Sequence, residues 1–168
     1  MHIPAQLAKH LKDHALKMEE FVTADYSHLD ANGRKENCAE VRKICATAAA
    51  AIAPMPIPFA DIWTITPVQI LMVRAIANIY GYKFSEETVK EVFAVVGGGW
   101  LGQQVCLALF KIGLPGAGGI GGAAFVWAWT QGMGKAAELY FQSGMKMSKA
   151  QVKSALKEEV RRERDSAS

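Results

Sequence analysis

The sequence predicts an all-α protein: a bundle of helical hairpins with an apolar, glycine-rich centre and amphipathic helices at both ends. Three observations support this prediction. Apolar residues in the terminal segments recur at the 3.6-residue period of a helix. Helix-starting and helix-ending signals punctuate the chain. No run alternates convincingly between apolar and polar residues, 92–96 coming nearest. A length of 168 residues suits one domain.

The first element predicted is an amphipathic helix over residues 3–26, with apolar residues on one face and lysines on the other. A turn is expected at 30–33. A second helix is expected over about 35–53, ended by Pro54 because proline lacks an N–H and clashes with the preceding turn. An extended corner is then expected at three prolines, Pro54, Pro56 and Pro58.

Capping signals place the next two helices. Thr66, Pro67 and Gln69 combine a threonine cap, proline at the first helical position and glutamine at the third. A helix is therefore expected from there to Tyr80, ending at Gly81. Ser85 then caps a helix with acidic residues in its first turn. That helix is expected to continue toward residue 110, with a break or kink at the glycines of 97–99.

A turn at 114–116 precedes a long apolar helix over 123–141. Small residues recur along it, which lets another helix approach closely. The residues expected to pack helices together are Gly118, Gly122, Ala124, Ala128, Gly132 and Ala136. Ser148 and Gln151 then form a capping box that opens a charged final helix. The chain accordingly divides into an N-terminal helix (1–33), a hydrophobic hairpin domain (34–145) and a C-terminal helix (146–168).

The charges gather at the two ends of the sequence. Of 35 charged residues, 14 lie in 1–43 and 13 in 135–168, leaving 8 for the 91 residues between. The uncharged runs 92–110 and 112–134 reach the length of a bilayer-spanning helix. A net charge of +3 is too balanced to predict a nucleic-acid partner. Three cysteines without a CxxC motif predict neither a disulfide framework nor a zinc site, and favour a reducing compartment.

No catalytic, cofactor or metal site is predicted. Two GxGxxG patterns begin at Gly97 and Gly116, but neither has the strand and the acidic residue that a dinucleotide site needs. No phosphate-binding loop is present, so the chain is not a self-sufficient GTPase. His10 and His14 have metal-ligand spacing, yet no further ligands accompany them, and a partly buried His14 is the preferred interpretation. The chain is therefore expected not to be an enzyme.

Asp61 and Arg74 are isolated charges in the apolar middle. They are interpreted as a capping side chain and an outward-reaching one, in preference to a polar element inside a membrane. Trp100, Trp127 and Trp129 lie beside or within the apolar runs, where core packing competes with a role as interfacial anchors. Mixed charges over 153–165 favour a solvated helix face over a polybasic lipid contact.

Several short motifs in order carry a resemblance to a known family. Three prolines precede Asp61, then come a helix start, a Tyr-Gly pair and a Thr-Gln-Gly-Met-Gly run. The residues that carry it are Pro54, Pro56, Pro58, Asp61, Gln69, Tyr80, Gly81, Thr130 and Gly134. Over about 40–145 the chain resembles the bacterial domain-of-unknown-function family 697. The resemblance implies a helical hydrophobic domain, often fused to Era-like or EngA-like GTPases or present in inner-membrane proteins, and implies no catalytic residue.

The leading hypothesis is a non-enzymatic, membrane-associated helical module at, or integral to, the bacterial inner membrane. Apolar hairpins at about 44–80 and 88–141 would insert in or lie against the bilayer, with both charged ends cytoplasmic. A separate GTPase is the expected protein partner, no cofactor or nucleic acid is expected, and a homo-oligomer is left open. The alternatives are a soluble cytoplasmic bundle that acts as a protein-interaction module, its terminal helices covering the apolar middle, and a pore-forming or membrane-inserting hairpin protein.

Overall fold

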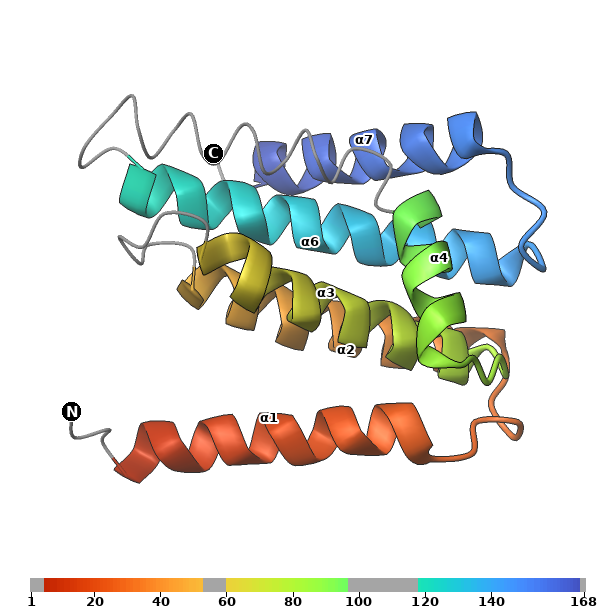
Figure 1. Ribbon diagram of the computed structural model, residues 1–168, viewed down its shortest axis with the longest axis horizontal. Coiled ribbons are helices and arrows are strands. Elements are labelled where there is room, and N and C mark those ends of the chain that lie inside the picture. The colour runs from red at the N-terminus through yellow and green to blue at the C-terminus, as the bar shows by residue number, and fades with distance from the viewer. Residues whose placement is uncertain (1–4, 53–59, 97–117, 167–168) are drawn as a thin grey trace.

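The computed structural model describes residues 5–52, 60–96 and 118–166, and the side chains of 13–51, 65–96 and 122–166. Within those ranges it contains helices and no strand, which confirms the all-α prediction (Figure 1). The helices are α1 (Ala5–Thr23), α2 (Ala31–Ile52), α3 (Ala60–Ile79), α4 (Glu86–Val96), α6 (Gly118–Gln142) and α7 (Lys149–Ser166). The proline corner, Gly97–Gly99, the turn at 114–116, Trp100 and Cys106 lie outside the described residues.

The helices stack in layers, as Figure 1 shows. Helix α7 packs on α6, α6 packs on both α2 and α3, and α1 lies on the opposite side, mainly against α3. The short α4 crosses one end of the bundle and contacts α3, α6 and α7. The two terminal helices therefore cover opposite sides of a central group formed by α2, α3 and α6.

A single large apolar core joins these layers. Helix α3 contributes Met72 and Ile76, which are fully buried, α2 contributes Val41, and α6 contributes Met133 and Phe141. Burying side chains of this size is the main stabilising term in a fold of this kind, at about 1.5–3 kcal/mol each. A smaller cluster of buried residues, Ala49, Ile65 and Val126, joins the same three helices nearer their other end.

The expected turn at 30–33 is wrong, because residues 31–33 already belong to α2. Asp30 is the capping residue: its Oδ1 accepts a hydrogen bond of 2.7 Å from the N–H of Gly33, and its carbonyl accepts one from Arg34. Aspartate followed by small residues is ambiguous in sequence, because a turn and a helix N-terminus use the same side-chain-to-backbone hydrogen bond.

The expected helix start at Thr66 and Pro67 is also wrong. Helix α3 begins at Ala60, so Pro67 lies inside it. Gln69 makes no capping bond and is instead completely buried, with its amide against α6. Before the proline, Ile65 is fully buried in a cluster with Ala49 of α2 and Val126 of α6, so tertiary packing favours a helix that continues past the position where local signals would start it.

Three other helix ends agree with their predicted signals, whereas α6 begins at Gly118, before the predicted 123. Ser85 Oγ accepts a hydrogen bond of 3.3 Å from the N–H of Thr88, so Ser85 caps α4. Ser148 and Gln151 form the reciprocal capping box of α7, with bonds of 2.8 and 3.3 Å. Gly81, with φ of 85°, ends α3, and the N–H of Tyr82 reaches the carbonyl of Ala77 as in a Schellman motif.

Candidate functional site

The strongest polar feature of the described core is an ion pair between α2 and α6. Arg42 Nη1 donates to Glu138 Oε2, and both side chains are buried. Lys135, one turn before Glu138 on α6, donates to Glu138 Oε1 at 2.8 Å. Arg42 Nε is buried and has no hydrogen-bond partner. One carboxylate therefore pairs with two cations, and of the two Lys135 is the one that reaches partly to the surface.

Gly134 makes room for the arginine of this pair. A Cβ atom at Gly134 would lie 2.5 Å from Arg42 Cγ, 2.7 Å from Arg42 Cδ and 2.9 Å from Met72 Sδ. Any larger residue would therefore displace the arginine stem from the surface of α6. Gly134 belongs to the Thr-Gln-Gly-Met-Gly run of the family motif, so the motif includes the position that admits Arg42.

A second buried polar contact joins α3 to α6. Gln69 Nε2 donates to Thr130 Oγ1 at 3.1 Å, and both residues are fully buried. Gln69 Oε1 has no partner within the described structure. Gln69 and Thr130 are far apart in the sequence but belong to the same set of motif residues, and the fold brings them into direct contact.

Two weakly acidic groups lie in the electrostatic field of Glu138. Burial raises the pKa of the Cys38 thiol to about 12, and the Glu138 carboxylate adds to the rise. Burial likewise raises the pKa of Tyr80 to about 12, with Cys38 and Glu138 contributing. The guanidinium of Arg34 lies 5.9 Å from the centre of the Tyr80 ring. Cys38 and Tyr80 therefore stay protonated and unreactive at neutral pH.

The residues expected to pack helices occupy different environments along α6. Gly132 faces α7: a Cβ atom there would lie 2.6 Å from Val160 Cγ2 and 2.9 Å from the Leu156 carbonyl oxygen. Ala128 and Ala136 are buried, whereas Ala124 is exposed. At Gly122 no described atom lies within 4 Å of a Cβ position. Gly118 is the first residue of α6.

The family-motif residues likewise occupy different environments. Gln69 and Thr130 are in contact in the core, Gly134 is buried against Arg42, and Tyr80 and Gly81 form the end of α3. Asp61 lies in the first turn of α3, and its side chain is outside the described set, as are Pro54, Pro56 and Pro58.

Sequence reasoning did not single out Arg42, Lys135 and Glu138 as a cluster. The signal was present, because Lys135 and Glu138 are the only charges between Lys111 and Lys146 and lie three residues apart on a helix. Their buried partner on α2 could not be identified without the packing of α2 against α6.

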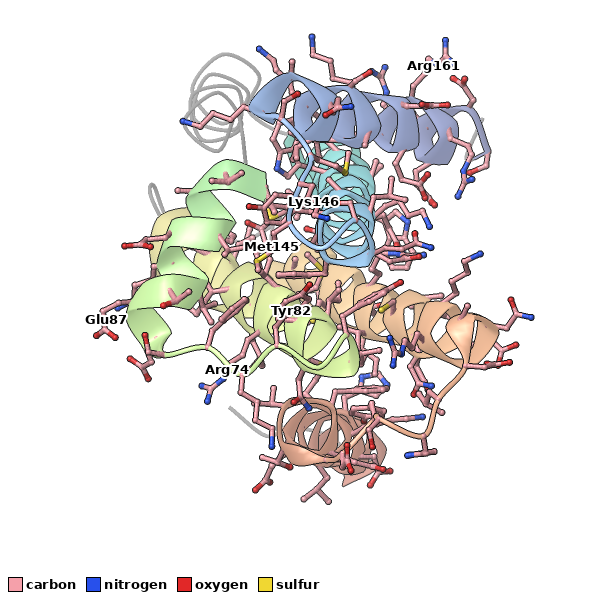
Figure 2. All side chains as sticks on the ribbon, turned by 90° about the vertical axis from the view of Figure 1, so that its right-hand side faces the viewer. Arg74, Tyr82, Glu87, Met145, Lys146 and Arg161 are labelled. Carbon is pink, nitrogen blue, oxygen red and sulfur yellow. The ribbon has the colours of Figure 1, made fainter. Side chains whose placement is uncertain are left out.

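The remaining candidate residues lie apart from this cluster. His14 is half-buried on α1, and no group of His, Cys, Asp or Glu among the described residues could hold a metal ion. Arg74 is exposed and extends away from the body of the molecule (Figure 2). Trp127 Nε1 donates to Glu163 Oε2 on α7 at 3.4 Å. Trp129 Nε1 is buried without a partner.

The uncharged runs 92–110 and 112–134 have the length of membrane-spanning helices, although the sequence leaves open whether they insert in a bilayer or lie against it. Of the helices in the described ranges, none combines the length and the hydropathy needed to cross a bilayer. Helix α6 covers the second run from Gly118 onward, and α4 covers only the first residues of the other run.

Comparisons with known proteins give one family and one relative. The chain is 30% identical over 93 residues to "Magnetosome membrane protein 22" of Magnetospirillum gryphiswaldense. The match covers 53% of this chain and 47% of that protein, so the chain spans about half the length of the curated relative. No solved structure matches the chain. The sequence pattern of the family described as "Domain of unknown function (DUF697)" matches residues 17–165. This match covers nearly all of the chain, which therefore belongs to that family.

Proposed function

We propose that the protein is a non-enzymatic, membrane-associated helical module that meets the lipid through one end of its bundle. The observation that carries this proposal is the position of the uncharged stretches of the three central helices. These stretches are 44–52 of α2, 62–73 of α3 and 118–134 of α6. Since α2 runs opposite to α3 and α6, all three lie at the same end of the molecule (Figure 1). We name these three stretches together the uncharged end; the charged last turns of α7 lie beside them, with Glu163 at Trp127.

The exposed side chains of the uncharged end agree with contact to an apolar medium. Among the described residues of these stretches, the exposed ones are Thr47, Ala51, Pro67, Leu71 and Ala124. Leu71, at 38%, is one of two large apolar residues that are exposed in the part of the chain whose side chains are described. Soluble proteins ordinarily intersperse both signs of charge over such a surface. The absence of charge over parts of three helices therefore supports association with lipid over full solvation.

The relative supports the same proposal. The protein from Magnetospirillum gryphiswaldense is named as a membrane protein, and the chain matches about half of it. The cytoplasmic face of a bacterial inner membrane is the proposed location, because the C-terminal part carries eight basic and five acidic residues. A separate Era-like GTPase is the proposed protein partner, since members of the resembled family are often fused to such domains and this chain has no phosphate-binding loop.

A second candidate function has its own supporting observation. Helices α1 and α7 cover opposite sides of the central helices, as a soluble protein-interaction module would require. Val152 and Leu156 of α7 are buried, and α7 approaches α6 closely enough for Gly132 to touch its backbone. A bundle closed in this way on two sides would bind a partner protein, and not lipid, through the uncharged end.

Fractionation distinguishes the two functions. The full chain is expressed without a tag that binds membranes, and the lysate is separated into soluble and membrane fractions, with a carbonate wash of the membranes. We expect the chain in the membrane fraction. A double variant, Leu71→Glu with Ala124→Glu, places two charges at the uncharged end and is expected to shift the chain toward the soluble fraction. Full recovery of the unmodified chain as a monodisperse soluble protein without detergent would contradict the membrane proposal.

The matched control carries the same charge elsewhere. Ala39 and Ala31 are exposed on the charged half of α2, so Ala31→Glu with Ala39→Glu adds equal charge away from the uncharged end. This control is expected to fractionate like the unmodified chain. Leakage of dye from liposomes, measured with the same proteins, would instead favour the pore-forming alternative.

A further inference from the structure

Two tryptophans of the uncharged end have different surroundings. Trp127 and Trp129 are two residues apart on α6, so at about 100° per residue they lie on nearly opposite sides of the helix. Both are half-buried. Trp129 packs against the large apolar core and against Phe125, with 5.9 Å between the ring centres. Trp127 belongs to neither apolar cluster of the described core, and its indole N–H reaches another helix, where it donates to Glu163 of α7.

Trp127 lies on the border between uncharged and charged surface. On α6, residues 118–134 carry no charge, and Ala124, one turn before Trp127, is exposed. On α7, seven of the eight residues 158–165 are charged. The ring of Trp127 bridges these two surfaces, because its N–H contacts a carboxylate of α7. Its apolar body is therefore next to uncharged surface and its polar atom next to charged surface.

The contact of Trp127 with α7 is a loose one. The distance from Trp127 Nε1 to Glu163 Oε2 is 3.4 Å, whereas an ordinary N–H···O bond measures about 2.7–3.2 Å. Glu163 is itself half-buried, so water reaches this contact. Packing within the bundle thus accounts for Trp129, but it does not account for a large amphipathic side chain at the position of Trp127.

We propose that Trp127 anchors the uncharged end in the headgroup layer of a lipid bilayer, with the last turns of α7 on the water side. This inference rests on the proposed membrane association and adds to it a contact residue and an orientation. An indole ring prefers the membrane–water interface, because its apolar body meets the acyl chains while its N–H meets headgroups and water.

The position of Trp127 favours lipid over a protein partner. A tryptophan that anchors a protein partner usually lies near the centre of an interface, surrounded by contacts that exclude water. Trp127 instead lies at the edge of its uncharged surface, against a helix whose facing residue is the half-buried Glu163. A border of this kind matches the change from acyl chains to headgroups at the surface of a bilayer.

Fluorescence of single-tryptophan chains tests the depth of the ring. One chain keeps Trp127 and carries Trp63→Phe, Trp100→Phe and Trp129→Phe. The matched chain keeps Trp129 and carries Trp127→Phe in its place. Vesicles of phosphatidylcholine and phosphatidylglycerol carry bromine, which quenches indole fluorescence, on the acyl chains either near the headgroups or near the bilayer centre. We expect vesicles to shift the emission of Trp127 to shorter wavelength, with stronger quenching by bromine near the headgroups, and to leave the emission of Trp129 unchanged.

Substitutions of Trp127 in the otherwise unmodified chain test its contribution to binding, measured by flotation with the same lipids without bromine. We expect Trp127→Ala to weaken binding roughly ten-fold, since a large apolar side chain loses its contact with lipid. Trp127→Tyr is expected to keep most of the binding, because tyrosine also prefers the interface. Urea unfolding measures the stability of each variant. Binding losses that follow stability, and not the interfacial preference of the side chain, would overturn the anchor.

Failure of this inference and failure of the proposed function give different results. If the chain floats with vesicles while Trp127 is quenched no more than Trp129, the anchor is wrong and membrane association stands. Stronger quenching of Trp127 by bromine at the bilayer centre would overturn its place in the headgroup layer. Absence of flotation would contradict the proposed function and this inference with it. A shift of Trp127 emission with rising protein concentration and no vesicles would show that a second copy covers the ring, and the lipid assignment would be wrong.

Discussion

The ion pair between Arg42 and Glu138 stabilises the contact of α2 with α6 only while both partners are present. Removing one partner leaves a buried charge without compensation, at a cost of about 3–5 kcal/mol. We expect Glu138→Ala to lower the free energy of unfolding, measured in urea, by an amount in that range, because Arg42 is almost completely buried.

Two further variants test whether that loss of stability comes from the unpaired buried charge. Arg42→Met combined with Glu138→Leu is expected to recover most of the stability, since apolar replacements remove both buried charges together. Lys17→Ala breaks an exposed pair with Glu40 and is expected to cost at most about 1 kcal/mol. A double variant as unstable as Glu138→Ala would show that the charges themselves are required.

Gly132 sets how closely α7 approaches α6. We expect Gly132→Ala to destabilise the fold by about 1–3 kcal/mol, although alanine favours helices, because its Cβ would lie 2.9 Å from a backbone oxygen of α7. Ala124→Leu adds more volume at an exposed position of the same helix and is expected to change stability by less than about 0.5 kcal/mol. Thermal unfolding of both variants decides the point, and an unchanged midpoint for Gly132→Ala would contradict the close approach.

Buried thiols make stability depend on alkaline pH. Burial raises the pKa of Cys45 from its ordinary 9.0 to about 12, so the unfolded chain loses this proton before the folded chain does. The stabilisation is complete below pH 9 and is lost as pH rises from 9 to 12. Between pH 7 and pH 10, we expect the free energy of unfolding of Cys45→Ala to fall by about 1 kcal/mol less than that of the unmodified chain. Equal losses in urea titrations at the two pH values would refute this.

Within helix α3, Pro67 stands at a position that does not require proline. It occupies an exposed position inside the helix and removes one backbone hydrogen bond. We expect Pro67→Ala to raise the free energy of unfolding by roughly 1–2 kcal/mol, the helix gain being partly offset by a more flexible unfolded chain. Pro67→Gly should show a smaller gain or none, since glycine is a poor helix former. A decrease for Pro67→Ala would mean that packing around Gln69 requires the proline geometry.

The helix boundaries show what can be predicted from the sequence. Ser148 with Gln151, and Ser85 with the acidic residues that follow it, gave correct boundaries because a capping box acts through neighbours in the sequence. Thr66 with Pro67 carries an equally good local signal, yet α3 begins six residues earlier. The described tertiary contact before Pro67 is that of Ile65 with Ala49 and Val126 on two other helices, which no local pattern encodes. The buried cluster at Glu138 escaped prediction for the same reason.

Across the whole molecule, the two terminal helices are attached unequally. In the described part of α1, Met18 and Phe21 are buried, and Asn78 donates hydrogen bonds to the carbonyls of Phe21 and Ala24 at 3.0 and 2.9 Å. Helix α7 instead packs on α6 along most of its length (Figure 1). We expect the backbone amides of α1 to exchange with deuterium faster than those of α6 and α7, because segments with few buried contacts open at low free energy.

The variant Asn78→Ala tests this difference. It should speed exchange in the C-terminal half of α1 and leave α7 unchanged, since the two carbonyls lose their donor. Arg74→Ala, an exposed change one turn earlier on α3, serves as the control and should alter neither helix. Mass spectrometry of peptides from each helix gives the readout. Uniform protection of α1 and α7 in the unmodified chain would contradict unequal attachment.

Aromatic side chains from the connection after α3 and from the end of α6 pack together. They lie at the end of the bundle opposite to the uncharged end. Tyr82 and Phe84, which follow α3, lie 5.4 and 6.0 Å in ring-centre distance from Phe141, near the end of α6. Tyr82 also lies near Met145, in the connection after α6 (Figure 2). This contact fixes the relative position of α3 and α6 at this end, and opening the other end would have to break the contact of Gln69 with Thr130. Any opening of the uncharged end would therefore be a rotation of α3 and α6 about these three rings. A bulky probe inserted between the two helices should change the surroundings of Phe141 least.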